Sequence, residues 1–253
     1  MIKVIIFDLD GVLVDTKMIH YEALNLALKK FKFEKISIND HIKIFDGLPT
    51  FKKLEILNKK IGLPKKEFSK INEYKQKITS KILKKKIKKN KKLINLFKFL
   101  HKDHKIAVAT NAVKSTLNIC LNKLELNKYI DYKLSNEDVN HPKPKPEIYL
   151  RIFVHFGVYP SNALVFEDSH YGREAAVSSG AQLYPIKDIK DLKAKNIKLF
   201  LKSKKTNHTK NISWEDNKMN VLIPMAGAGK RFADAGYIFP KPLIEINNKP
   251  MIQ

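Results

Sequence analysis

The stretch Phe7-Asp8-Leu9-Asp10-Gly11-Val12-Leu13-Val14-Asp15-Thr16 decides the fold of this chain. It continues the short apolar run of residues 3–7 (KVIIF), which has no alternation and is typical of a strand buried on both faces of a parallel sheet. Side chains alternate along extended backbone, so Asp8 and Asp10 share one side, and Gly11 allows a sharp turn after them. Because ligands of open parallel sheets bind at the carboxyl ends of the strands, the sequence predicts two carboxylates at a ligand site.

Two carboxylates this close repel each other unless a cation or a shared proton lies between them. The pair therefore predicts a bound Mg²⁺, two separated pKa values, or both. A pair of carboxyl groups that only caps the loop is the structural alternative.

The rest of the chain alternates predicted helices and strands in the order typical of a parallel α/β sheet. The expected strands after the first are residues 105–109, 132–134, 163–166 and 182–185, and the helices of this part are 93–101, 114–124, 146–156 and 172–179. A helical insertion separates the first two strands, with expected helices at 18–30, 40–45, 50–61 and 66–86, and Thr16 as N-cap of the first.

Three further motifs follow at strand ends or in rigid turns. Strand 105–109 ends in Thr110-Asn111 before a helix, a pattern that fits a phosphate site but, taken alone, favours an ordinary helix cap. In Lys143-Pro144-Lys145-Pro146-Glu147 two prolines fix the backbone and can aim a lysine. Strand 163–166 ends in Glu167-Asp168-Ser169, again with adjacent acids. The neighbouring residues Lys145 and His170 are expected at the surface.

In order and spacing these motifs resemble those of the haloacid dehalogenase-like superfamily of phosphatases and phosphomutases. The resemblance covers roughly residues 1–200 and implies an α/β, Rossmann-like parallel core interrupted by an inserted α-helical cap. The expected domains are a catalytic core at 1–16 and 88–201, the cap at 17–87, a linker at 202–218 and a C-terminal fragment at 219–253.

The resemblance also implies roles for the motif residues. Asp8 would be the nucleophile that forms an aspartyl phosphate, and Asp10 the acid and base that serves it. Lys143 would offset their negative charge. Thr110 and Asn111 would hold the phosphoryl group. The ligands of Mg²⁺ would come from Asp8, Asp10 (through its backbone carbonyl) and Asp168, with Glu167 supporting the metal.

Two cap positions are candidate substrate contacts. His20 lies one helical turn after Thr16, and a histidine there contacts substrate or assists the acid in the similar β-phosphoglucomutases; a structural histidine is the alternative. Gly47 lies in Gly47-Leu48-Pro49-Thr50, which resembles the substrate loop of the cap. The mutase pattern has an arginine shortly after this glycine, where Pro49 and Thr50 stand here. That difference favours water as the acceptor.

The C-terminal fragment resembles the start of sugar-phosphate nucleotidyltransferases. Gly227, Gly229 and Arg231 match the nucleotide loop, and Lys241 matches a Lys-Pro motif. The fragment is shorter than an independent domain, so we do not expect nucleotide transfer by this chain alone. That the chain is the front part of a longer bifunctional enzyme is a further alternative.

The amino-acid composition limits the kinds of partner that we expect the protein to bind. The formal charge is +24, but 46 of the 49 basic residues are lysine, spread along the chain, which does not favour specific recognition of nucleic acid. A nonspecific nucleic-acid binder that has kept an inactive fold is the alternative from a different functional class. The single cysteine, Cys120, falls in an apolar pattern and is expected in the core. No signal peptide or membrane span is evident, so we expect a cytoplasmic protein.

The sequence therefore predicts a Mg²⁺-dependent phosphatase that hydrolyses a small phosphomonoester, a sugar phosphate, through phospho-Asp8. A sugar phosphomutase of the same fold is the nearest alternative. The sequence does not indicate which phosphorylated compound is bound or which oligomer forms.

Overall fold

The computed structural model describes residues 1–187, 189–206, 245–246 and 249–250 of the 253-residue chain. The chain divides into two compact units, Met1–Thr209 and Lys210–Gln253. In the second unit, strands β6 (Glu245–Ile246) and β7 (Lys249–Pro250) pair antiparallel. All residues discussed below as site residues belong to the first unit.

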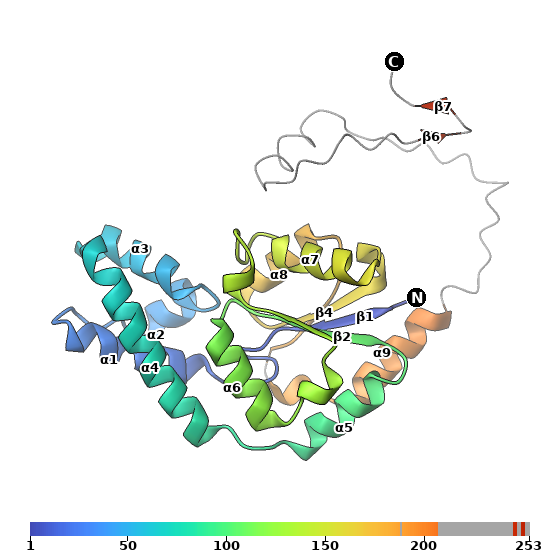
Figure 1. The fold of residues 1–253 in the computed structure, drawn as a ribbon, viewed down its shortest axis with the longest axis horizontal. Helices are drawn as coiled ribbons and strands as arrows, with labels where there is room; N and C mark the ends of the chain where they lie inside the picture. Colours follow the sequence, from blue (N-terminus) through green and yellow to red (C-terminus); the bar gives the residue numbers. More distant parts are fainter. Residues whose placement is uncertain (188, 207–244, 247–248, 251–253) are drawn as a thin grey trace. The chain divides into compact units, whose positions relative to one another are not determined.

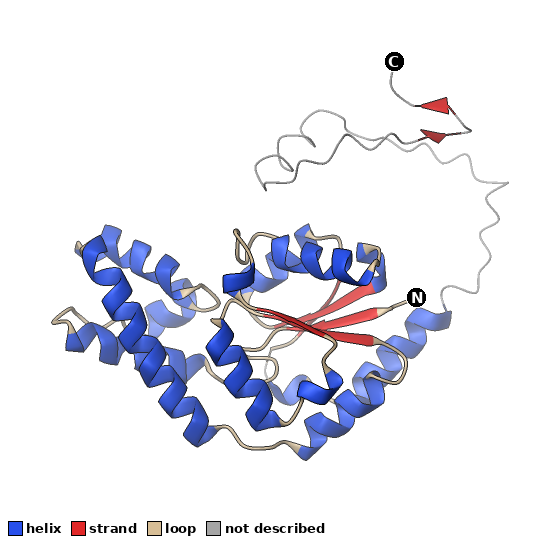
Figure 2. Ribbon diagram, in the orientation of Figure 1, coloured by secondary structure: helices blue, strands red, loops and turns tan. Residues whose placement is uncertain are grey.

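The first unit is built on a five-stranded parallel sheet in the order β3-β2-β1-β4-β5 (Figure 2). Strand β1 (Val4–Phe7) is central and fully buried, as its uninterrupted apolar sequence predicts. The other strands are β2 (Lys105–Ala109), β3 (Tyr132–Leu134), β4 (Ala163–Glu167) and β5 (Gln182–Pro185). The expected α/β, Rossmann-like fold class is confirmed.

Alternating side chains of the strands enter two apolar layers, one on each face of the sheet. Helices α5 (Lys91–Leu100), α6 (Lys114–Leu124) and α9 (Ala194–Thr206) cover one face, and α7 (Glu147–Phe156) and α8 (His170–Ser178) cover the other (Figure 1). Cys120 is buried in the first layer, as expected.

Stacked aromatic rings hold β1 in place just before the first aspartate. The ring of Phe7 lies between those of Phe97 and Phe166, with both centroid separations at 4.8 Å. Full burial of a phenylalanine side chain contributes about 2 to 3 kcal/mol. The backbone that carries Asp8 is thereby fixed against its neighbours.

A helical segment stands between β1 and β2, at the place where the cap was expected. It comprises helices α1 (Lys17–Lys30), α2 (Ile38–Asp40), α3 (Thr50–Ile61) and α4 (Phe68–Lys86), with a π-helix at His41–Phe45 and a 3₁₀ turn at Lys65–Glu67. These helices enclose their own apolar cluster, separate from the two layers of the sheet. The 17–87 boundaries of a cap domain stay a prediction.

Two local expectations need correction. Thr16 stands at the N-cap position of α1, but its hydroxyl donates to Asp10 and makes no bond with the helix backbone. Helix α9 ends at Thr206, so residues 202–206 are helical where an irregular linker was expected; residues 207–218 lie outside the described residues.

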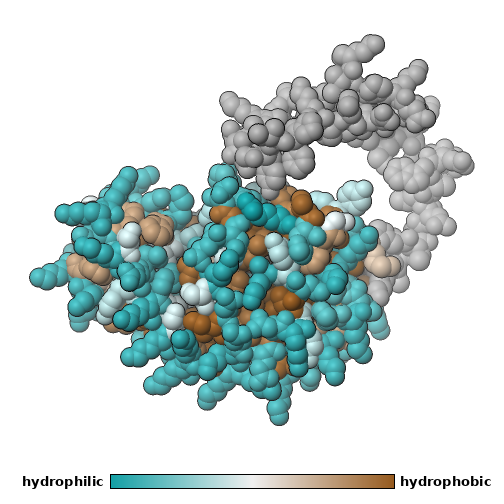
Figure 3. Space-filling view, in the orientation of Figure 1, coloured by the Kyte–Doolittle hydropathy of each residue, from teal (hydrophilic) through white to brown (hydrophobic). Residues whose placement is uncertain are grey.

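The surface of the first unit reflects its composition. Figure 3 shows hydrophilic side chains over most of the face in view, with smaller apolar patches between them. Lys145 and His170 are exposed, as expected. No helix among the described residues is long and apolar enough to cross a membrane.

Candidate active site

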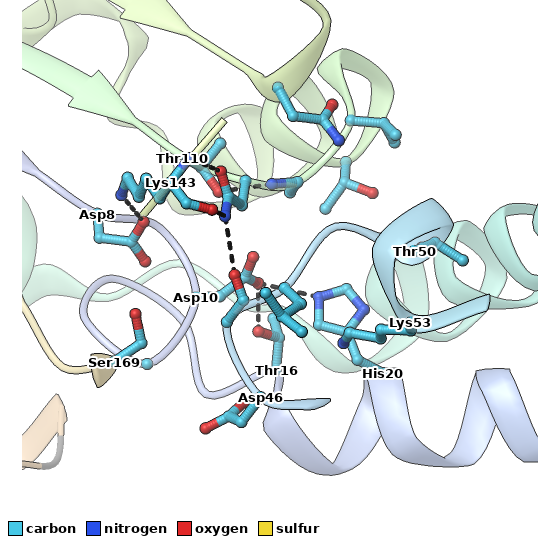
Figure 4. Close-up of a pocket in the computed structure, with 18 of the residues that line it drawn as sticks. Asp8, Asp10, Thr16, His20, Asp46, Thr50, Lys53, Thr110, Lys143 and Ser169 are labelled. Atoms are coloured by element: carbon cyan, nitrogen blue, oxygen red, sulfur yellow. Dashed lines mark hydrogen bonds and ion pairs between the residues drawn. The ribbon is translucent and has the colours of Figure 1, made fainter. Parts of the chain in front are cut away.

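Polar residues gather where the carboxyl ends of the three central strands meet the helical insertion. Asp8 follows β1, Thr110 follows β2, and Asp168 follows β4. Together with residues of α1, α3 and α4 they line a cavity of about 310 Å³ (Figure 4). A cavity of this size suits a small molecule. The parallel register of the strands brings these residues together, although they are far apart in the sequence.

Lys143 is the central cation of the site and is 2% exposed. Its ammonium donates to Asp8 Oδ1 at 2.6 Å, to the Ala109 carbonyl at 2.8 Å, and to Glu167. Burial opposes its charge, but the carboxylates of Asp8 and Glu167 outweigh burial and raise the pKa of Lys143 well above its usual value. Lys143 is therefore a fixed positive charge beside Asp8.

Tyr149 on α7 joins the same buried cluster. Its hydroxyl donates to Glu167 Oε1 at 2.8 Å, and its ring lies 5.2 Å from the Lys143 ammonium. Glu167 is fully buried and also accepts a hydrogen bond of 3.3 Å from the Ser169 hydroxyl. Glu167 is thus held on several sides, which suits a carboxylate that supports a metal site.

Three carboxylates form a potential cation site. Asp8, Glu167 and Asp168 each offer an oxygen, and these oxygens lie within 4.8 Å of one another. Burial, reinforced by the charge of Glu167, raises the pKa of Asp8 well above its usual value and that of Asp168 to about 7. Asp168 Oδ1 is buried with no hydrogen-bond partner among the described residues. A hard divalent cation with oxygen ligands fits this set.

Gly11 makes room for that carboxylate. Its φ is +85°, and a Cβ at this position would lie 2.0 Å from Asp168 Oδ2. Only glycine combines this left-handed backbone with such a close approach. The turn after Asp10 is therefore shaped around the Asp168 side chain.

Asp10 is held apart from the three-carboxylate cluster by the cap. Its Oδ1 accepts from the Thr16 hydroxyl and lies 3.1 Å from His20 Nε2, while His20 Nδ1 lies 3.2 Å from the Lys75 ammonium. Burial by itself raises the Asp10 pKa, but His20, Thr16 and Lys75 together lower it to about 2. The carboxylate is not in the cluster, which leaves the Asp10 carbonyl as its expected contribution to a metal.

Thr110 is fully buried and borders the cavity. Its hydroxyl oxygen accepts from the backbone N–H of Ala112 at 3.0 Å, the bond expected of a cap. This bond leaves the hydroxyl hydrogen available to a ligand oxygen. Capping and phosphate binding are therefore compatible at this residue.

Asn111 and Gly47 are joined to each other. The Asn111 amide donates to the Gly47 carbonyl at 2.9 Å and to the Lys143 carbonyl at 3.0 Å, and its Oδ1 accepts from Lys143 N–H at 3.0 Å. Both amide hydrogens are used, although a contact with phosphate was expected. In this structure Asn111 connects the loop of Gly47 to the loop that carries Lys143.

Two residues that the sequence analysis did not single out, Lys53 on α3 and Lys75 on α4, also line the cavity. Both are buried on the same helical stripes as apolar side chains, Lys53 four residues before Leu57 and Lys75 four residues after Ile71. A lysine inside an apolar stripe is a signal that periodicity alone could have given. The nucleotide-loop candidates of the C-terminal fragment lie outside the described residues: Gly227, Gly229, Arg231 and Lys241.

Comparisons with known proteins agree with this site. Residues 5–186 match the family described as haloacid dehalogenase-like hydrolase. A phosphorylated carbohydrates phosphatase of Thermotoga maritima is 32% identical over 184 residues, which cover 71% of this chain and 82% of that protein. A fructose-1-phosphate phosphatase of Escherichia coli is 26% identical over 176 residues, 70% of this chain and 92% of that protein.

Solved structures show the same fold. A β-phosphoglucomutase of Clostridium difficile superposes with a TM-score of 0.68 at 23% identity, over 81% of this chain and all of that one. A putative β-phosphoglucomutase of Thermotoga maritima gives 0.58 at 27% identity, over 80% and 99%. The comparisons confirm the expected phosphomonoester hydrolase. The match over residues 5–186 shows that the chain belongs to the haloacid dehalogenase-like hydrolase family, and the carboxylates at its strand ends agree with this.

Proposed function

We propose that the protein is a Mg²⁺-dependent phosphatase that hydrolyses a small sugar phosphate through an aspartyl phosphate on Asp8. The observation that carries the proposal is the convergence of Asp8, Lys143 and the acidic cluster on one cavity of about 310 Å³. The two relatives named as phosphatases of phosphorylated carbohydrates and of fructose 1-phosphate support the substrate class.

The reaction would proceed in two displacements at phosphorus. An Asp8 carboxylate oxygen attacks the phosphorus atom while the bond to the sugar oxygen breaks, and Asp10 gives a proton to that oxygen. Water then attacks the phosphorus of the aspartyl phosphate, Asp10 takes the proton, and inorganic phosphate leaves with Asp8 restored. Lys143 neutralises charge on Asp8 and on the phosphoryl oxygens throughout.

The low pKa of Asp10 suits the second displacement directly, because an ionised carboxylate can take a proton from water. The first displacement needs that proton already on Asp10. The negative charge of a bound phosphate ester raises the pKa of a nearby carboxyl group. We therefore propose that substrate binding raises the pKa of Asp10 and that Asp10 becomes protonated as a result.

Mg²⁺ would be held by Asp8, Asp168 and the Asp10 carbonyl, with Glu167 in support. When bound, it supplies positive charge that offsets the repulsion between nucleophile and phosphate. A cation in this position would give the unpartnered Asp168 Oδ1 a ligand partner. It would also lower the raised pKa values of Asp8 and Asp168.

The decisive experiment measures phosphate release from a panel of sugar phosphates, with and without Mg²⁺, by wild type and Asp8→Asn. Removal of the nucleophile should lower the rate at least about a thousandfold. Asp103→Asn makes the same change at an exposed aspartate just before β2, at the other end of the sheet, and should leave the rate unchanged. Full activity in Asp8→Asn would exclude the proposed nucleophile.

A sugar phosphomutase is the second candidate, because two solved structures with this fold are named as β-phosphoglucomutases. In this chain Thr50 lines the cavity next to Pro49, where the mutase pattern has an arginine. We propose water as the acceptor for that reason. Following one sugar phosphate by phosphorus NMR separates the two activities: the hydrolase releases inorganic phosphate, whereas the mutase moves the group to another hydroxyl.

A further inference from the structure

Two lysines of the cap face the cavity without a carboxylate to neutralise them. Lys53 is 6% exposed and Lys75 is 5% exposed. The Lys53 ammonium makes no hydrogen bond or ion pair within the part of the chain that the structure describes, and that of Lys75 contacts only His20 Nδ1, at 3.2 Å. Burying an ammonium group without an anion is costly, so lysines are rarely found this way.

The nearby acids are committed to other partners. Asp46 forms an ion pair of 2.7 Å with Lys17, and Asp10 is held by Thr16 and His20. Desolvation lowers the pKa of Lys53 to about 8, and desolvation together with the charge of Lys53 lowers that of Lys75 to about 7. The two cations thus repel each other in a buried part of the cavity, where the more distant Asp46 and Asp10 offset their charge only in part.

The lysines lie on the opposite side of the cavity from the nucleophile. In Figure 4, Lys53 and His20 stand on the cap side, whereas Asp8 and Lys143 stand on the core side. All four border the same cavity, together with Lys75. A small molecule whose phosphate sits at Asp8 therefore extends its other end toward Lys53 and Lys75.

We propose that Lys53 and Lys75 form a second anion subsite, and that the preferred substrate carries a second anionic group, a carboxylate or a phosphate, at the end remote from the phosphate that is hydrolysed. This inference rests on the proposed phosphatase function and narrows its substrate class. A bound anion would supply the negatively charged hydrogen-bond partner that the two lysines lack among the described residues. A charge-assisted hydrogen bond of this kind contributes about 1.5 to 3 kcal/mol, or roughly a 10- to 100-fold preference.

The test compares substrates that differ only in the second group. Glucitol 6-phosphate and 6-phosphogluconate are both open chains and differ by a carboxylate; fructose 6-phosphate and fructose 1,6-bisphosphate differ by a phosphate. For wild type we expect kcat/KM to be at least about tenfold higher for the anionic member of one pair, mainly through a lower KM. The pair that shows the preference identifies the anionic group.

Substitutions of the two lysines then test whether they cause this substrate preference. In Lys53→Met and Lys75→Met, and in the more conservative Lys53→Gln and Lys75→Gln, the ratio of the two kcat/KM values should fall toward one. Lys52→Met is the matched control, because Lys52 is the exposed neighbour that pairs with Glu55 at 2.9 Å, and it should keep the wild-type ratio. Thermal unfolding verifies that each variant is folded before its ratio is compared.

The outcomes separate the two proposals. Phosphate release that is equal within about threefold for both members of each pair leaves the phosphatase intact and overturns the second subsite. A preference that survives in the folded variants of both lysines also overturns it. Failure of wild type to release phosphate from any of the four compounds counts against the proposed function itself, and the subsite proposal falls with it.

Discussion

Lys53 occupies a position in α3 where the neighbouring buried side chains are mostly apolar, including Leu54 and Leu57. Burial lowers its pKa from 10.5 to about 8, against the opposing attraction of Asp46 and Asp10. The folded protein therefore disfavours the charged form of this lysine, whereas the unfolded chain does not. The charged lysine therefore lowers the free energy of unfolding at pH values where Lys53 is protonated in both the folded and the unfolded state, that is, below pH 8.

Lys53→Met should accordingly stabilise the fold at low pH and not at high pH. A pKa lowered from 10.5 to about 8 corresponds to a cost of about 3 kcal/mol below pH 8, which disappears as the pH rises to 10.5. Urea unfolding at pH 6.5 and pH 10 measures the difference between variant and wild type. A gain in the free energy of unfolding that is equal at both pH values would contradict the shifted pKa.

Individual residues were predictable where a motif fixed them. Asp8, Thr110 and Asp168 follow apolar strands, so their place at the carboxyl edge of the sheet follows from the strand alone. Lys53 and Lys75 were not predicted, because lysines are so frequent in this chain that one inside an apolar stripe is easily taken for a surface residue. The partners of Asn111 depend on loops that meet only in the folded molecule.

At the level of elements, helix α8 begins against the acidic cluster. Ser169 caps it by accepting from Gly172 N–H at 3.1 Å, and a Cβ at Gly172 would lie 2.1 Å from the Glu167 carboxyl group. Alanine is the better helix former by about 1 kcal/mol, so helix propensity favours the substitution and packing opposes it. Packing should decide, because Glu167 is fully buried and cannot move into solvent.

Gly172→Ala should therefore displace Glu167, lower the melting temperature and raise the Mg²⁺ concentration needed for half-maximal phosphate release. Ser178→Ala, at an exposed position of the same helix, changes helix propensity without touching the cluster and should leave both quantities near wild type. Thermal unfolding and a Mg²⁺ titration of activity measure them. An unchanged Mg²⁺ requirement in Gly172→Ala would show that the helix start does not position Glu167.

Elements were predictable to the extent that periodicity defined them. The parallel sheet and the helices around it followed from apolar strand runs of β-branched residues and from the 3.6-residue pattern. Helix α9 was missed altogether, because lysines interrupt its apolar residues all along its length. The role of Thr16 was also missed, because a threonine before a helix predicts a cap, whereas here tertiary contact with Asp10 takes its hydroxyl.

At the scale of the whole molecule, the described residues that line the site all belong to Met1–Thr209. Removal of residues 210–253 should therefore leave kcat/KM for a sugar phosphate within about twofold of the full chain, and the melting temperature nearly unchanged. Steady-state kinetics and thermal unfolding of the two proteins, compared side by side, test this expectation. A loss of activity greater than about tenfold would mean that the second unit contributes to the site.

The three hydrogen bonds of Asn111 connect it to two different parts of the first unit. Only the bond to the Gly47 carbonyl crosses to the cap loop, while the other two bind the backbone of Lys143 within the core. Loss of the Gly47 contact alone would leave the other two bonds in place. The loop that carries Lys143 is therefore anchored from within the core, so the position of its ammonium beside Asp8 does not depend on the segment that carries Gly47.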